Sequence, residues 1–199
     1  MGAMELFESR KLINETIVNP RSAASKILSF KLDESHVVQA GFFVAICSTI
    51  LTYFFLKLLS KQVTDVELNN NLVLEELFTY MMSIQPIFFT ANQMLQMLLF
   101  SALITLGGKV FGGLGKFFDA FVCVIWIEFV LLILKLFQII LLPISLILAF
   151  VILIPGVIWS LWAFASMAAA IHGFQSTILT FFVGLGLSLL ILTLFNIVY

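Results

Sequence analysis

The last sixty-four residues of the chain, from Leu136 to Tyr199, contain no Asp, Glu, Lys or Arg. Upstream as far as Ala120, only Glu128 and Lys135 are charged. A water-soluble domain carries charged side chains over its surface, so a tract this apolar is solvated by hydrocarbon. The composition agrees, since 62% of the residues are hydrophobic and 11% are charged. The sequence therefore predicts a single polytopic membrane domain.

Five apolar stretches are long enough to cross a hydrocarbon core of roughly 30 Å as helices. They lie at 37–59, 84–106, 120–142, 146–171 and 177–199. These stretches show no alternation with a period of two residues, which excludes membrane-spanning β-strands. We therefore expect an all-α membrane protein, with a five-helix transmembrane domain over 37–199 and a cytoplasmic segment over 1–36.

The third and fourth stretches form one apolar run from 120 to 171, and the chain must turn within it. We place this turn at Pro143 to Ser145, because two spans of ordinary length then remain. Pro155-Gly156 becomes a kink inside the fourth helix, which neighbouring helices can tolerate. A re-entrant piece over 144–154 is the alternative.

A short helix is expected before the first span. Asn19-Pro20 is typical of an N-cap followed by proline at the first helical position, and the helix would run to about Lys31. Its apolar residues fall on one face: Ala23, Ala24, Ile27 and Leu28. Because this amphipathic helix is too short to span, we expect it to lie in the cytoplasmic interface, on an anionic leaflet. Docking on the protein's own loops is the alternative.

The distribution of basic residues predicts the orientation. Five lie before the first span and two in the loop 107–119, against Lys57 at the end of the first span and Lys61 in the acidic loop that follows it. Because cytoplasmic flanks retain Lys and Arg, the N-terminus is expected in the cytoplasm and the C-terminus on the opposite side.

Polar side chains at membrane depth form a candidate cluster. Glu128 and Lys135 are costly there and lie two turns apart on one helix face, which Gln138 extends. The second span offers a polar stripe as partners: Gln85, Asn92, Gln93 and Gln96. Two hypotheses follow, namely a path for protons or polar solutes, or a hydrogen-bond network that fixes helix packing.

Small residues mark a packing face on the fourth and fifth spans. They include Ala165, Ser166, Ala169 and Ala170 in the fourth span and Gly184 and Ser188 in the fifth. Small residues four apart let helix backbones approach closely, so these spans should pack together or against another subunit.

Five glycines fill the loop between the second and third spans: Gly107, Gly108, Gly112, Gly113 and Gly115. The loop fails as a phosphate-binding motif, because Phe117 follows Gly115-Lys116 where Ser or Thr is required. We expect a tight cytoplasmic turn at the interface with aromatic anchors.

The sequence carries no recognised catalytic or metal-binding pattern. His172 and Ser176 lie one turn apart, but no orienting group or oxyanion donor follows them. There is no HExxH motif and no cluster of His and Cys. We expect no enzymatic activity, no metal and no cofactor. With a net charge of -1 and no dense basic run, nucleic acid is not an expected partner.

Three segments together resemble the Yip family of polytopic membrane proteins, and its bacterial branch in particular. They are Asn19-Pro20-Arg21 before the amphipathic helix, the glycine loop from Phe111 to Phe117, and the stretch from Ile158 to Trp162 that runs on to His172-Gly173-Phe174-Gln175-Ser176. The resemblance covers about 17–199.

The resemblance implies five helices, a cytoplasmic N-terminus and no catalytic residues. It also implies a scaffold role in trafficking, membrane shaping or partner recruitment, through membrane lipid, other integral membrane proteins or self-association. The chain lacks the Asp-Leu-Tyr-Gly-Pro signature and the long hydrophilic N-terminal region of eukaryotic members, which argues against a Rab-type GTPase as partner. The expected location is a bacterial inner membrane. A small channel or transporter, and an accessory subunit of a membrane complex, are the alternative functions.

Overall fold

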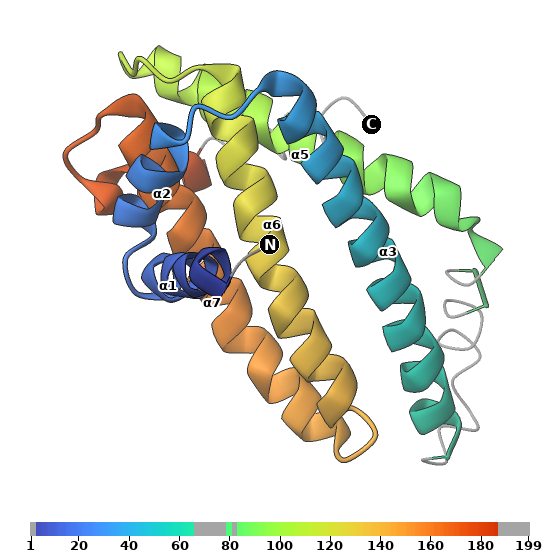
Figure 1. Ribbon diagram of the computed structural model, residues 1–199. Coiled ribbons are helices and arrows are strands. Elements are labelled where there is room, and N and C mark those ends of the chain that lie inside the picture. Colours follow the sequence, from blue (N-terminus) through green and yellow to red (C-terminus); the bar gives the residue numbers. More distant parts are fainter. Residues whose placement is uncertain (1–2, 66–78, 81–82, 187–199) are drawn as a thin grey trace.

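The computed structural model describes residues 3–65, 79–80 and 83–186, and every regular element in these ranges is a helix (Figure 1). The helices are α1 (Ala3–Val18), α2 (Pro20–Ser29), α3 (Glu34–Asp65), α5 (Pro86–Val110), α6 (Phe117–Leu141) and α7 (Leu146–His172). A further helix, Thr177–Gly186, follows α7. For the described residues, the predicted all-α class is confirmed.

Within the described ranges, four helices are long and apolar enough to cross a membrane. They are Glu34–Lys61 within α3, and the whole of α5, α6 and α7. These four cover the first four expected spans. The helix Thr177–Gly186 begins where the fifth expected span begins, but residues 187–199 lie outside the described residues. A fifth crossing therefore stays a prediction.

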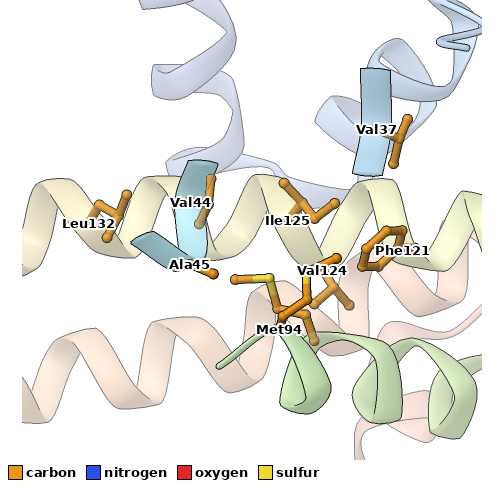
Figure 2. Close-up of a cluster of buried hydrophobic side chains, with 9 residues drawn as sticks. Val37, Val44, Ala45, Met94, Phe121, Val124, Ile125 and Leu132 are labelled. Carbon is orange, nitrogen blue, oxygen red and sulfur yellow. The ribbon is translucent and has the colours of Figure 1, made fainter. Parts of the chain in front are cut away.

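The helix α6 lies at the centre of the bundle. Of its most apolar stretch 44% is buried, against 17% to 28% for the other three candidate spans, and it packs against α3, α5 and α7. In Figure 1, α3, α6 and α7 run side by side and α5 crosses them obliquely. Side chains of α3, α5 and α6 meet in the buried cluster of Figure 2, which includes Val37, Val44, Ala45, Met94, Phe121, Val124, Ile125 and Leu132. The remaining faces are largely apolar and exposed, as contact with lipid requires.

The chain turns between α6 and α7 at residues 142–145. Ser145 caps α7, and its side chain accepts a hydrogen bond from the N–H of Leu148. The helix then continues through Pro155, without a separate re-entrant piece. A Cβ atom on Gly156 would lie 2.3 Å from Leu134 of α6, so glycine allows the two helices to pack closely at this point.

The N-terminal helices pack on the side of the bundle. The Asn19 side chain accepts from the N–H of Ser22, and Pro20 opens α2. The apolar face of α2 lies against α6 and α7, in a cluster of Ala24, Ile27, Cys123, Ile127, Ala163 and Met167. The helix was expected in the cytoplasmic interface, with docking on the protein's own loops as the alternative. Its apolar face is instead buried against helices of the same chain. The preceding helix α1 was not expected from the sequence.

Candidate functional site

The C-terminal end of α7 places His172 inside the protein. Gly173 ends the helix with a φ of 72°, in the left-handed region that glycine adopts without strain. The N–H of Phe174 then donates to the carbonyl of Ala169 at 2.9 Å. His172 is only 4% exposed, and its ring lies against the loop that follows α5.

Both ring nitrogens of His172 have partners. Nδ1 accepts from the backbone N–H of Gly115 at 3.1 Å, and Nε2 lies 3.0 Å from the carbonyl oxygen of Ile104. Because an N–H donates to Nδ1 and a carbonyl only accepts, this arrangement fits a neutral ring with its proton on Nε2. The hydroxyl of Ser176, four residues further along the chain, accepts instead from the N–H of Leu179 at 3.2 Å. The His172 ring therefore has no nitrogen left to act as a general base.

Three glycines make room for the imidazole. A Cβ atom on Gly108 would lie 2.1 Å from His172 Nε2, one on Gly113 would lie 2.3 Å from Nδ1, and one on Gly115 would lie 2.6 Å from Cε1. Such distances are far inside van der Waals contact. The other two glycines have different surroundings, since Gly112 has a φ of 80° in open space and Gly107 is half-buried. All five glycines were predicted in a tight loop, but Gly107 and Gly108 lie within α5, which continues to Val110. Three of the five enclose a histidine.

Arg21 of α2 binds the segment after α7. Its guanidinium donates to the carbonyl oxygen of Gln175 at 2.8 Å and to that of Phe174. The ring of Phe174 in turn stacks on the His172 imidazole, with centroids 5.4 Å apart. The three segments that carried the family resemblance therefore meet at one end of the bundle. We call this set the junction: Arg21, Gly108, Gly113, Gly115, His172 and Phe174.

The polar residues of the candidate spans form separate pairs. Gln93 of α5 donates to Glu128 at 3.3 Å. Lys135 donates to Ser48 at 3.2 Å and to Thr52 at 2.9 Å, both on α3. We call these two sets the span contacts.

The other members of the expected cluster lie elsewhere. Asn92 and Gln96 are on an exposed face of α5, and Gln138 is buried on α6. Ser48 and Thr52 were not among the expected partners of Lys135. The signal that could have identified them is a pair of hydroxyl side chains four residues apart in an apolar span.

The predicted packing face of small residues is only partly described. Ala165, Ser166 and Ala169 are buried, and Ala170 is half-buried. Gly184 is exposed, and Ser188 lies outside the described residues. Close packing of the fourth expected span against the fifth therefore stays a prediction.

Two tryptophans attach the N-terminal helices to the spans. Trp126 of α6 donates to the hydroxyl of Thr16 at 2.8 Å, and Trp159 of α7 donates to the carbonyl of Ile17 at 3.1 Å. Glu15 joins α1 to α2 through Lys26 at 2.6 Å and Ser22 at 2.5 Å. The hydrogen bonds from Lys26 and then Ser22 lower the pKa of the Glu15 carboxyl. These contacts define the α1–α2 unit, residues 10–29.

No three His, Cys, Asp or Glu side chains in the described ranges come together as metal ligands. The junction holds one cation and one neutral ring, both engaged by backbone groups. Its geometry joins α2, the loop after α5 and the end of α7.

The family comparison covers these elements. The Yip1 domain matches residues 14–198. The chain belongs to the Yip1 domain family. The match starts within α1 and includes the junction, the span contacts and all four candidate spans. It identifies the chain as a membrane protein of the Yip family. No curated protein and no solved structure matches the chain.

Proposed function

We propose that the chain is a non-enzymatic scaffold of the bacterial branch of the Yip family, which binds other integral membrane proteins or lipid in membrane organisation or trafficking. The observation that carries the proposal is the exposed pair Asn92 and Gln96 on α5. Gln96 lies ten residues after Pro86, near the middle of this 25-residue helix.

Exposed amides at that depth favour a protein partner. A side-chain amide in hydrocarbon lacks hydrogen bonds, and a second membrane helix can supply them. Because Asn92 and Gln96 are four residues apart, they lie on one face of α5. The apolar side chains of Leu99 and Leu103 extend this exposed face by two turns. The face thus combines apolar contact area with two directional polar groups, as an intramembrane docking surface requires.

The junction supports a structural role. Its histidine and arginine are bonded to backbone groups, and these bonds leave no His172 nitrogen to move a proton or attack a substrate. We also propose the orientation given by the basic residues, with the N-terminus in the cytoplasm and the C-terminus opposite. The junction end then faces the cytoplasm of a bacterium. The partner is a second copy or another membrane protein, including the case of an accessory subunit in a larger complex.

Site-specific photocrosslinking in native membranes tests the α5 face. A benzophenone amino acid at Gln96 should give a protein adduct larger than the chain itself, identified by mass spectrometry. The matched control is the same probe at Phe54 of α3, which is 52% exposed and should give lipid adducts. The proposal would be contradicted if the probes at both positions formed adducts with lipid alone.

A small channel or transporter is the second candidate. Its support is the hydroxyl of Tyr53, which is buried without a hydrogen-bond partner among the described residues and lies on α3 next to Thr52 of the span contacts. Glu128→Gln combined with Lys135→Met separates the two functions. Impaired assembly in mild detergent supports packing, whereas an intact fold with a lost solute flux in liposomes supports transport.

A further inference from the structure

The α1–α2 unit contacts the spans deep inside the bundle. Trp126 lies nine residues after the start of α6, and Trp159 lies thirteen residues before the end of α7. With a rise of 1.5 Å per residue, these positions are about 14 and 20 Å from the junction end of their helices. Figure 1 shows α1 beside α7, about midway along that helix, and the hydrogen bonds from both tryptophans place α1 at this level.

On the α3 side, the same level of the bundle faces hydrocarbon. Gly41 lies against Ile125 of α6, and Phe43 lines an apolar groove of about 330 Å³ together with Trp126. Phe43 is 62% exposed, and Ile46, one turn further along, is 48% exposed. An outward face of this kind is expected within the acyl chains.

On the α1 side, charged side chains are exposed at a comparable level. Arg10 and Lys11 of α1 are exposed, while Glu15 is paired with Lys26. Val18, at the corner between α1 and α2, is 83% exposed and apolar. Charged groups in hydrocarbon are very unfavourable unless water or phosphate groups reach them. At this level, the exposed apolar side chains beside α3 need acyl chains, whereas the exposed charges beside α1 need water or headgroups. A membrane with a flat surface cannot provide both at the same depth.

We infer that the α1–α2 unit lies within the leaflet at the junction end and brings phosphate headgroups and water down to the level of α1. Val18 then contacts acyl chains, while Arg10 and Lys11 bind anionic headgroups. The leaflet is thinner beside α1 than beside α3, so the protein favours a deformed membrane. This inference rests on the proposed function, because it names the lipid partner of the scaffold and its binding face.

Fluorescence quenching in vesicles of phosphatidylcholine and phosphatidylglycerol tests the inference. Single cysteines would be introduced at three exposed positions, Lys11, Val18 and Ile46, and labelled with a small environment-sensitive dye. The unmodified chain, whose Cys123 is buried and Cys47 half-buried, gives the background signal. Only variants that insert with the wild-type helix content are compared, and none of the three positions contributes to the junction or the span contacts.

The dye at Val18→Cys should lose as much fluorescence to bromines placed mid-chain on the lipid as the dye at Ile46→Cys. The dye at Lys11→Cys should instead be quenched by aqueous iodide, as strongly as a control at Lys116→Cys in the glycine loop. Iodide quenching at Val18 without bromolipid quenching would place α1 outside the bilayer and overturn the inference. Protection of Lys11 from both quenchers would also overturn it, since protein would then cover this face. Neither result bears on the α5 face, so the crosslinking experiment stays independent.

Discussion

The junction and the span contacts satisfy polar side chains in two different ways. In the junction, Arg21 and His172 bond to backbone amides and carbonyls, and glycines hold the partner backbones close. In the span contacts, a charged or amide side chain reaches a side chain of a neighbouring helix. The junction therefore depends on a close steric fit between backbone and side chain. The span contacts depend on which polar groups the facing side chains carry. The comparison indicates that the junction should tolerate no added atom, whereas the span contacts should tolerate conservative changes.

The largest expected effect is that of Gly108→Ala. Its Cβ would lie 2.1 Å from His172 Nε2, so the ring must move and lose its bond to Ile104. We expect a loss of about 3 kcal/mol in the free energy of unfolding, from overpacking and a lost hydrogen bond. Thermal unfolding followed by circular dichroism measures it. The matched control is Gly186→Ala, where a Cβ meets no atom within 4 Å and no loss is expected. Equal effects at the two glycines would remove the claimed dependence on shape.

The second effect tests the bonds of Arg21. Arg21→Ala should cost about 1 to 2 kcal/mol, because the carbonyls of Phe174 and Gln175 lose a charged donor but are near enough to the surface to bind water. Arg21→Lys should recover only part of this loss, since an ammonium lacks the planar fork. Denaturant unfolding measures both variants. Full recovery by lysine would show that charge alone, without geometry, is sufficient at the junction.

A smaller effect is expected for Lys135→Met in the span contacts. Membrane hydrogen bonds of this kind are worth about 0.6 to 1.7 kcal/mol, and removing the charge offsets part of the loss. Thr52 keeps its own bond to the carbonyl of Ser48 at 2.8 Å, so its hydroxyl is not left unpaired. Unfolding in mixed micelles compares this variant with Gly108→Ala. A larger loss for Lys135→Met than for Gly108→Ala would reverse the ranking of the two regions.

The smallest effect concerns pH and the α1–α2 unit. Because the pKa of Glu15 is lowered in the folded protein, its bond to Lys26 is fully stabilising above the ordinary carboxyl pKa near 4.5 and is lost as the pH falls through the folded value. Amide hydrogen exchange of α1 should therefore increase in that acidic window. Glu15→Gln should show the faster exchange already at pH 7 and lose this pH dependence. An unchanged pH profile in Glu15→Gln would assign the effect to another group.

Much of the architecture could be predicted from local sequence. Uninterrupted apolar runs of about 20 residues fix where the candidate spans lie, and Asn19-Pro20 marks the start of α2. The helix α1 was not predicted, because its charged and apolar residues alternate without a clear face. The partners of Lys135 were also missed, because the rotation of α3 about its own axis depends on packing with α6.

The junction could not be predicted for a different reason. The glycine loop and His172 each looked like an isolated motif, and 57 residues separate Gly115 from the ring that it binds. Clustered glycines indicate that another group packs closely against the backbone, but they do not indicate which side chain it is. Only the antiparallel course of α6 and α7 brings the two segments to the same end of the bundle.

A double-mutant cycle between Gly108 and His172 tests the central claim most directly. The four proteins are the unmodified chain, Gly108→Ala, His172→Ala and the double variant, compared by their free energies of unfolding. If the glycine is required because the imidazole lies against it, the cost of Gly108→Ala should fall from about 3 kcal/mol to below about 1 kcal/mol once the ring is removed. The same cost in both backgrounds would contradict the account.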